Sequence, residues 1–195
     1  MSRPASQPLA LCTGWPALDA ALGGGWPVGE LTEIVGRGRC SLALGAVRAA
    51  QADGRPVGWV DGPGVFCPAT ARVDLAALTL VRPRGVRSSA LFAAELLLRS
   101  RAFALLVLDA EPGRDTLSQW FRLARQARVA ESALLLLGAP GATRAGSAAG
   151  CTLRVSLCHA ETPDWAPLGA ASLAVRLLRR RGAAVGGACL HLGPG

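Results

Sequence analysis

The chain contains no lysine and no tyrosine, so any basic side chain that contacts an anionic partner must be an arginine. All 21 basic side chains are therefore arginines. The strong use of Ala, Gly, Pro and Arg indicates a GC-rich genome. Because such a genome disfavours certain residue types, the absence of one type is by itself weak evidence about function.

Long hydrophobic runs are also absent. No stretch approaches the roughly 18 uninterrupted apolar residues of a membrane-crossing helix, and residues 1–12 lack the hydrophobic segment of a secretory signal. We expect a cytoplasmic protein that does not bind membranes. With 195 residues, 51% of them hydrophobic, the chain is long enough to bury a core without disulfides or metals. We expect one domain over residues 1–195.

Clustered metal ligands are missing as well. None of the six cysteines forms a CxxC pair, and the two histidines, His159 and His191, lie far apart in the sequence. Zinc sites need clustered ligands, so we expect no metal. In a cytoplasmic protein we expect the cysteines to be reduced, buried thiols. They are Cys12, Cys40, Cys67, Cys151, Cys158 and Cys189.

The charge of the chain is strongly positive. The net charge is +8 and the isoelectric point is about 10.7. This excess suits an anionic partner such as nucleic acid or an acidic protein surface. The alternative, that the arginines only keep the protein in solution, stays open at this point.

Hydrophobic periodicity alternates between strand and helix through the first two thirds of the chain. Strands are predicted at residues 31–35, 56–61, 103–108 and 133–137, and helices at 42–52, 88–100 and 116–130. After residues 138–150 the period changes toward two, which predicts strands at 151–158, 171–179 and 183–192, the last two as a hairpin around 180–182. This order predicts an α/β fold with a mainly parallel central sheet flanked by helices and an antiparallel C-terminal extension.

Residues 12–36, CTGWPALDAALGGGWPVGELTEIVG, resemble the segment that leads into the phosphate loop of RecA-family recombinases. The order and spacing match over about 25 residues, far more than a single glycine motif would. The resemblance implies a RecA-like core. The shared residues are Thr13, Gly14, Leu18, Asp19, Leu22, Gly23, Gly24, Gly25, Pro27, Gly29, Glu33, Ile34 and Gly36.

The phosphate loop that the resemblance implies has lost its chemistry. A working loop, GxxxxGK followed by Ser or Thr, surrounds the phosphates with backbone N–H groups, a lysine and a magnesium-binding hydroxyl. Here Ser41 replaces the second glycine, Leu42 the lysine and Ala43 the Ser/Thr. We expect no bound nucleotide cofactor. The loop comprises Gly36, Arg37, Gly38, Arg39, Cys40, Ser41, Leu42 and Ala43.

Two further positions agree with this expectation. By the resemblance, Pro63 stands where RecA-like ATPases carry their water-activating glutamate, and proline cannot act as a base. Asp109 stands at the Walker B position, where we expect it only to cap or hydrogen-bond locally. We therefore expect a binding protein and no enzyme. The opposing reading, an active ATPase with an unusual loop, would need a phosphate-binding cation at Leu42.

Three groups of arginines are candidate contacts with a partner or with nucleic acid. Arg37 and Arg39 flank the loop, where a helix N-terminus attracts anions. The helix at 116–130 carries a stripe of Arg122, Arg125 and Arg128, with Leu117, Trp120, Phe121 and Ala124 expected on its core side. Arg179, Arg180 and Arg181, with Arg176 close by, are expected at the hairpin tip. A merely solvated face is the alternative for each group.

The two segments that would correspond to the DNA-binding loops of RecA lack the features that such loops need. Residues 110–115 are too short for an extended loop, and residues 138–150 carry a single charge, Arg144, and no aromatic residue. RecA-like strand exchange is therefore not expected, and a weak contact with DNA stays open.

Within the RecA-like group, the chain most resembles ImuA, an accessory protein of bacterial SOS mutagenesis. That resemblance implies an adaptor in translesion synthesis, with RecA, an ImuB-like protein related to Y-family polymerases and an error-prone DnaE-type polymerase as partners. The alternative is a SulA-like inhibitor that binds the tubulin-like cell-division protein.

Overall fold

The computed structural model describes residues 9–36, 38–84, 88–110, 117–138, 153–159, 173–180 and 189–192. Side-chain positions are described for residues 9–36, 38–84, 90–110 and 118–138 and for Val155. The predictions for Arg37, Arg144 and Arg181 therefore concern residues outside the described ranges.

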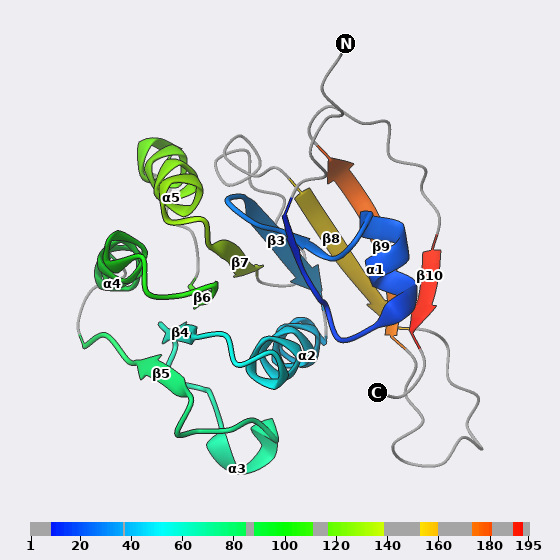
Figure 1. Ribbon diagram of the computed structural model, residues 1–195, viewed down its shortest axis with the longest axis horizontal. Helices are drawn as coiled ribbons and strands as arrows, with labels where there is room; N and C mark the ends of the chain where they lie inside the picture. The colour runs from blue at the N-terminus through cyan, green and yellow to red at the C-terminus, as the bar shows by residue number, and fades with distance from the viewer. Residues whose placement is uncertain are drawn as a thin grey trace.

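A sheet of eight strands forms the centre of the described part of the chain, in the order β10-β9-β8-β3-β7-β6-β4-β5 (Figure 1). Six neighbouring strands of this sheet, from β8 to β5 in the order given, pair with one another in parallel. This arrangement confirms the predicted α/β fold with a mainly parallel central sheet. The six are β3 (Leu31–Gly36), β4 (Val57–Asp61), β5 (Leu78–Val81), β6 (Leu105–Asp109), β7 (Ala133–Gly138) and β8 (Leu153–His159).

The antiparallel C-terminal extension is confirmed too. β9 (Leu173–Arg180) pairs antiparallel with β8, and β10 (Cys189–Leu192) pairs antiparallel with β9. β9 continues one residue beyond its predicted end at Arg179, while residues 181–188, which include the rest of the predicted tip, lie outside the described ranges. Arg179 and Arg180 lie in the strand itself, opposite Arg154 and Leu153 of β8.

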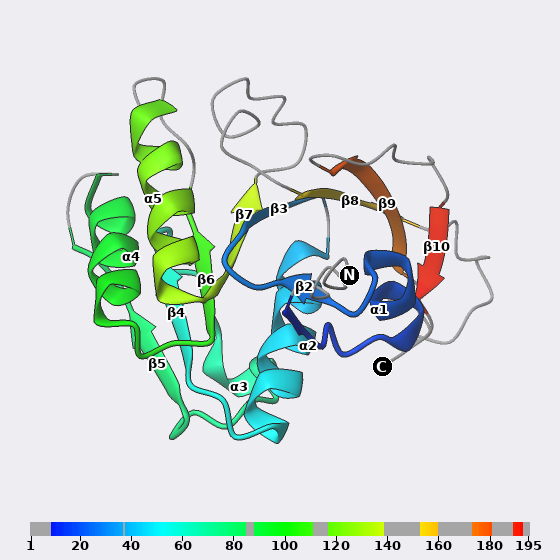
Figure 2. The same ribbon diagram turned by 45° about the horizontal axis from the view of Figure 1, so that its top comes forward.

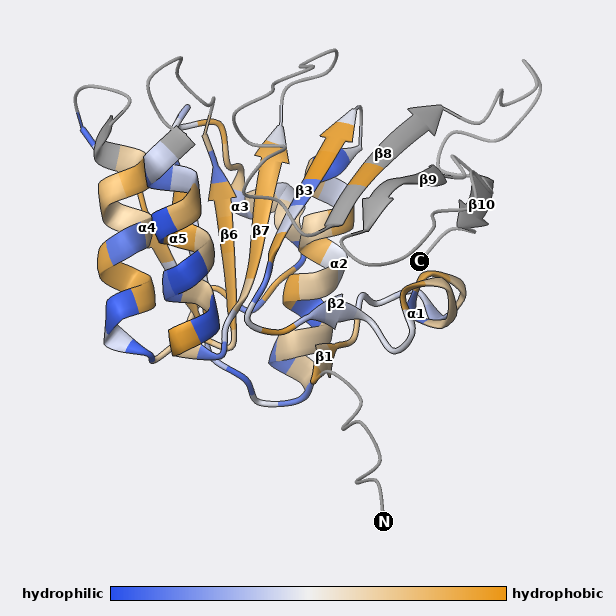
Figure 3. Ribbon diagram, turned by 90° about the horizontal axis from the view of Figure 1, so that it is seen from above, coloured by the Kyte–Doolittle hydropathy of each residue, from blue (hydrophilic) through white to orange (hydrophobic). Residues whose placement is uncertain are grey.

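Helices cover both faces of the sheet (Figure 3). Neighbouring residues of a strand point to opposite faces, so Leu105 and Val107 pack in the cluster under α2 (Arg39–Ala52). Leu106 and Leu108 pack instead in the cluster under α4 (Ser88–Ser100) and α5 (Leu117–Ala130). The unbroken hydrophobic runs of β6 and β7 are thus buried on both sides, as parallel strands between two helical layers must be.

The segment that carries the RecA resemblance folds into a small local unit. It contains β1 (Ala10–Leu11), α1 (Pro16–Leu22) and β2 (Trp26–Pro27), and β1 pairs antiparallel with β2. The carboxylate of Asp19 accepts hydrogen bonds from the Thr13 N–H (2.8 Å) and the Cys12 thiol (3.2 Å). A Cβ on Gly25 would lie 2.0 Å from the Leu11 carbonyl oxygen, so only glycine fits there. These shared residues therefore build the fold.

This unit, residues 10–27, here called the leader, also packs on α2. A Cβ on Gly45 of α2 would lie 2.1 Å from Cζ3 of Trp15, so this glycine makes room for the indole. In both Figure 1 and Figure 2, α1 lies beside β10 at the other end of the unit. The leader therefore joins the helical layer of α2 to the C-terminal end of the sheet.

Five short elements were not predicted from the sequence: β1, α1, β2, α3 (Pro68–Ala71) and the edge strand β5. The last two have four residues each, too few to show a hydrophobic period. α1 begins with proline at its first turn and ends at Gly23, whose φ of 76° is left-handed. Both are standard helix boundaries that the sequence displays.

The expectation that the cysteines are buried is wrong for Cys12 and Cys67, which are exposed, while Cys40 is half-buried. These three described cysteines are free thiols. Over the ranges that the structure describes, no helix combines the length and hydrophobicity needed to cross a bilayer.

Candidate functional site

The carboxyl ends of β3, β4 and β6 bring the phosphate-loop residues, Pro63 and Asp109 to one edge of the sheet. β3 leads into the loop before α2, while Asp61 at the end of β4 lies opposite Asp109 at the end of β6. Ligands of open parallel α/β sheets bind at this edge. The candidate site therefore lies where the fold would place a phosphate loop.

The loop keeps the backbone geometry of two glycines. Gly36 has φ of 104° and Gly38 has φ of 87°, values that side-chain-bearing residues rarely adopt. The helix then begins at Arg39, three residues before the predicted start at Leu42, and the Leu42 N–H donates to the Gly38 carbonyl at 3.0 Å. Leu42 and Ala43 consequently belong to the first turns of α2.

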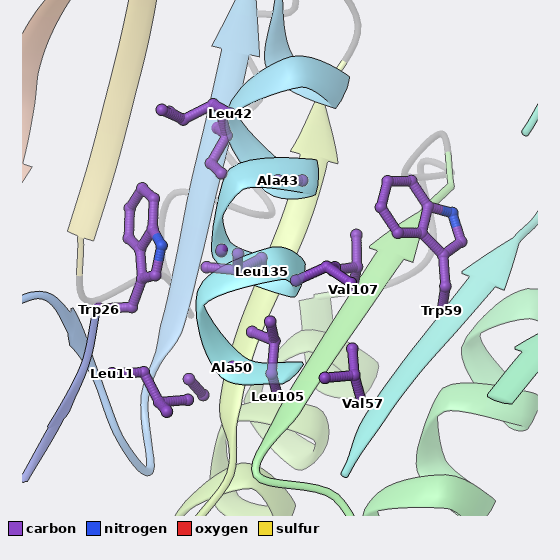
Figure 4. Packing of buried hydrophobic residues seen from close by; sticks show 14 of the residues in the cluster. Leu11, Trp26, Leu42, Ala43, Ala50, Val57, Trp59, Leu105, Val107 and Leu135 are labelled. Carbon is purple, nitrogen blue, oxygen red and sulfur yellow. The ribbon is translucent and has the colours of Figure 1, made fainter. Parts of the chain in front are cut away.

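Leu42 and Ala43 are both 0% exposed. They pack in the hydrophobic cluster between α2 and the sheet, as Figure 4 shows. Neighbouring Ser41 is exposed. The two positions at which an active loop needs an ammonium group and a hydroxyl are thus filled by apolar side chains in the core.

Asp61 uses its carboxylate to shape the loop that follows β4. It accepts hydrogen bonds from the N–H groups of Val65 and Phe66, both at 3.0 Å, and from Nε of Arg82 at 2.9 Å. Arg82 also donates to the Phe66 carbonyl. Pro63 lies in this loop and is exposed. Neither Asp61 nor Arg82 was predicted as a functional residue from the sequence. The only local signal was an aspartate before a Gly-Pro-Gly turn.

Asp109 is 5% exposed, and this burial raises the pKa of its carboxyl group. The Arg39 charge opposes that rise, and the negative charge of Asp61 adds to it. The Asp109 carbonyl accepts a hydrogen bond from the Gly62 N–H at 2.9 Å, and a Cβ on Gly62 would lie 2.7 Å from this oxygen. This local hydrogen bond is made by the Asp109 backbone. A local hydrogen bond to the Asp109 carboxylate, which the sequence led us to expect, stays a prediction.

Arg39 and Cys40 form the α2 side of the same edge, and both are half-buried. The Arg39 Nε is buried and has no hydrogen-bond partner among the described residues. Burial raises the pKa of the Cys40 thiol, and the charge of Asp109 raises it further. Within the described ranges, no three His, Cys, Asp or Glu side chains gather in a way that could hold a metal ion.

The arginine stripe of α5 differs in part from its prediction. Arg122, Arg125 and Arg128 are exposed, but Nη2 of Arg122 lies 2.8 Å from Oε2 of Glu95 on α4. Assigning Phe121 to the core side was wrong, because it is 46% exposed. The buried side of α5 comprises Trp120, Leu123 and Ala127. Because the side chains of β9 are not among those described, the structure does not relate Arg179 and Arg180 to this stripe.

No protein-family model matches this chain. About half of the chain is similar to curated RecA proteins. It is 41% identical over 107 residues to Protein RecA of Chlorobaculum parvum, which covers 51% of this chain and 30% of that protein. It is 40% identical over 113 residues to Protein RecA of Nocardia farcinica, covering 54% of this chain and 32% of that protein. The chain thus spans about a third of the length of the curated relatives it matches. This partial similarity supports a RecA-like family.

Proposed function

We propose that this protein is a catalytically inactive RecA-like accessory protein of the ImuA type. It acts in SOS-induced translesion DNA synthesis as an adaptor between RecA and a complex of an ImuB-like protein with an error-prone DnaE-type polymerase. The RecA-like similarity supports the fold from which such a protein would be built. The proposal of inactivity rests on the candidate site.

The full burial of Leu42 and Ala43 is the observation that carries this proposal. Phosphoryl transfer depends on positioned charges around the phosphates and on a bound magnesium ion. A leucine side chain packed in the core offers neither a charge nor a hydrogen-bond donor to a phosphate. Exposed Pro63, at the position assigned to the water-activating glutamate, offers no base.

Titration with a fluorescent ATP analogue in the presence of magnesium tests the inactivity. We expect no saturable binding and no release of inorganic phosphate, under conditions in which a purified RecA binds and hydrolyses ATP. Saturable binding that unlabelled ATP displaces would overturn this part of the proposal and favour the active ATPase.

An affinity purification from DNA-damaged cells of the protein's own host tests the adaptor role. We expect mass spectrometry to recover RecA, an ImuB-like protein or the error-prone polymerase with the tagged chain. Each recovered protein is then purified and tested for direct binding. Recovery of the tubulin-like division protein instead would contradict the adaptor role and support the SulA-like alternative.

A further inference from the structure

The outer side of α4 exposes two large hydrophobic side chains. Phe92 is 60% exposed and Leu96 is 49% exposed. Because they are four residues apart in one helix, they lie on the same face and adjoin each other. Single exposed hydrophobic residues are common on protein surfaces, so the groups around this pair decide its meaning.

Two arginines are fixed at the edge of this pair. The side chain of Glu95 is 8% exposed, and its two carboxylate oxygens lie 3.4 Å from Nη2 of Arg99 and 2.8 Å from Nη2 of Arg122. The arginine side chains remain 60% and 52% exposed. Glu95 therefore holds two guanidinium groups in place while part of each stays open to solvent. Holding side chains in place before binding lowers the entropy cost of using them in an interface.

The charge around the pair is positive. Glu95 is the only acidic residue in the sequences of α4 and α5, and it is shared by two arginines. Exposed Arg125 adds a further positive charge on α5. A guanidinium group binds carboxylates through paired N–H donors, so this edge suits a partner rich in Asp and Glu.

We propose that Phe92, Leu96, Arg99 and Arg122, here called the α4 face, form a docking surface for an acidic amphipathic helix of a partner protein. The apolar side of that helix packs on Phe92 and Leu96, and its carboxylates pair with Arg99 and Arg122. The α4 and α5 layer lies on the side of the sheet opposite α2, and so away from the degenerate loop (Figure 3).

Other occupants fit the α4 face less well. A two-fold dimer of this chain would set the same arginines against one another, in a protein of net charge +8. Nucleic acid would use the arginines but would leave Phe92 and Leu96 against a charged backbone. The inference deepens the proposed function, because it rests on the adaptor role and names the chemistry of one partner.

Fluorescence anisotropy with a labelled synthetic helix tests the surface. The probe is a peptide of about 20 residues, long enough to form a helix, with leucines at four-residue spacing and glutamates elsewhere. We expect saturable binding that Phe92→Ser and Arg99→Gln each weaken by at least about tenfold. The matched controls Leu9→Ser and Arg48→Gln change exposed residues outside α4 and α5, and we expect them to bind as the unchanged protein does.

The inference would be overturned if the peptide did not bind saturably, or if the α4-face variants bound it as tightly as the unchanged protein does. It would also be overturned if a peptide with lysines in place of glutamates bound as tightly as the acidic one. Loss of oligothymidine binding or of self-association in Phe92→Ser would assign the surface to nucleic acid or to a second copy of the chain instead. The adaptor role is judged separately. If Phe92→Ser still recovered the partners from cells, the surface would be wrong and the adaptor role would stand. If the unchanged chain recovered none, the adaptor role would fail, whatever the peptide did.

Discussion

At the position of Leu42, a buried leucine and a phosphate-binding ammonium group make opposite demands on their surroundings. The leucine is 0% exposed in the first turn of α2, whereas a lysine there would have to leave the core or lose its charge. We expect Leu42→Lys to lower the free energy of unfolding by at least about 3 kcal/mol in a urea titration. The same substitution at exposed Ser41 should change it by less than about 0.5 kcal/mol.

This comparison also bears on the site. If Leu42→Lys proved as mild as Ser41→Lys, the side chain at position 42 would reach solvent at the loop, and the argument against phosphate binding would weaken. If it is strongly destabilising, restoring the RecA-type residues one by one would cost stability before it gained any affinity for nucleotide.

The raised pKa of the Asp109 carboxyl group should make the free energy of unfolding depend on pH. Burial raises the pKa of its carboxyl group above the ordinary value of 3.8. Between that value and the raised one, the folded protein binds more protons than the unfolded chain, so the contribution of Asp109 to stability is lost as pH rises. Asp109→Asn has no such loss, so its stability relative to the unchanged protein should improve as pH rises through this window.

Urea midpoints measured from about pH 3.5 to pH 7 check the Asp109 prediction. Ser41→Ala, which changes an exposed residue without a titratable group, serves as the control, and its difference from the unchanged protein should stay nearly constant with pH. A constant difference for Asp109→Asn as well would show that the carboxylate is stabilised in the folded state by as much as burial disfavours it.

At the scale of elements, the contact between Trp15 and Gly45 fixes the leader on α2. Alanine is a better helix former than glycine by about 1 kcal/mol, but a Cβ on Gly45 would lie 2.1 Å from Cζ3 of Trp15. We expect the clash to win, so that Gly45→Ala lowers the free energy of unfolding by about 1–3 kcal/mol.

A double-mutant cycle isolates this contact. In a Trp15→Leu background the clash is gone, so Gly45→Ala should become neutral or stabilising there, and the coupling between the two sites should exceed about 1 kcal/mol. A Gly45→Ala protein that is more stable than the unchanged protein would mean that the leader is not seated on α2 as the structure has it.

The elements that the sequence predicted well are the strands buried on both sides and the longer helices with a clear hydrophobic period. The hydrophobic runs of β6 and β7 and the periodic pattern of α4 contain enough residues to exclude other structures. The edge strand β5 is only four residues long and half-exposed, so its pattern carries little information. Phe121 was misassigned because an amphipathic pattern gives the direction of a buried face to within only about one residue position.

The site was predictable where its residues are close in sequence and not where they are distant. The loop from Gly36 to Ala43 could be placed because residues 12–36, which carry the RecA resemblance, lead directly into it. By contrast, Arg82 reaches Asp61 across 21 positions, and Arg122 reaches Glu95 from another helix. Nothing in a single sequence pairs such residues, because the pairing is set by how the strands and helices pack.

At the scale of the whole molecule, the excess of arginine attracts any polyanion through long-range electrostatics. A specific binding site must therefore be distinguished from this general attraction. Reversing the charges of Arg179, Arg180 and Arg181 lowers the net charge of +8 by the same amount as reversing those of Arg48, Arg55 and Arg72. A difference between the two triple variants therefore reports position, since the long-range attraction changes equally in both.

If the cluster at the end of β9 contacts a partner, the Arg179, Arg180 and Arg181 variant should lose at least about tenfold in affinity for that partner or for single-stranded DNA. The control triple variant should lose much less, and raising the salt concentration should shrink the difference between them. Surface plasmon resonance with purified RecA, the ImuB-like protein and oligothymidine as the immobilised partners measures these affinities.

Equal losses of affinity in the two triple variants would assign the arginines to the general electrostatic attraction and remove the cluster from the candidate contacts. That would leave the α4 face, where two arginines are held in place by Glu95, as the basic surface with a defined geometry.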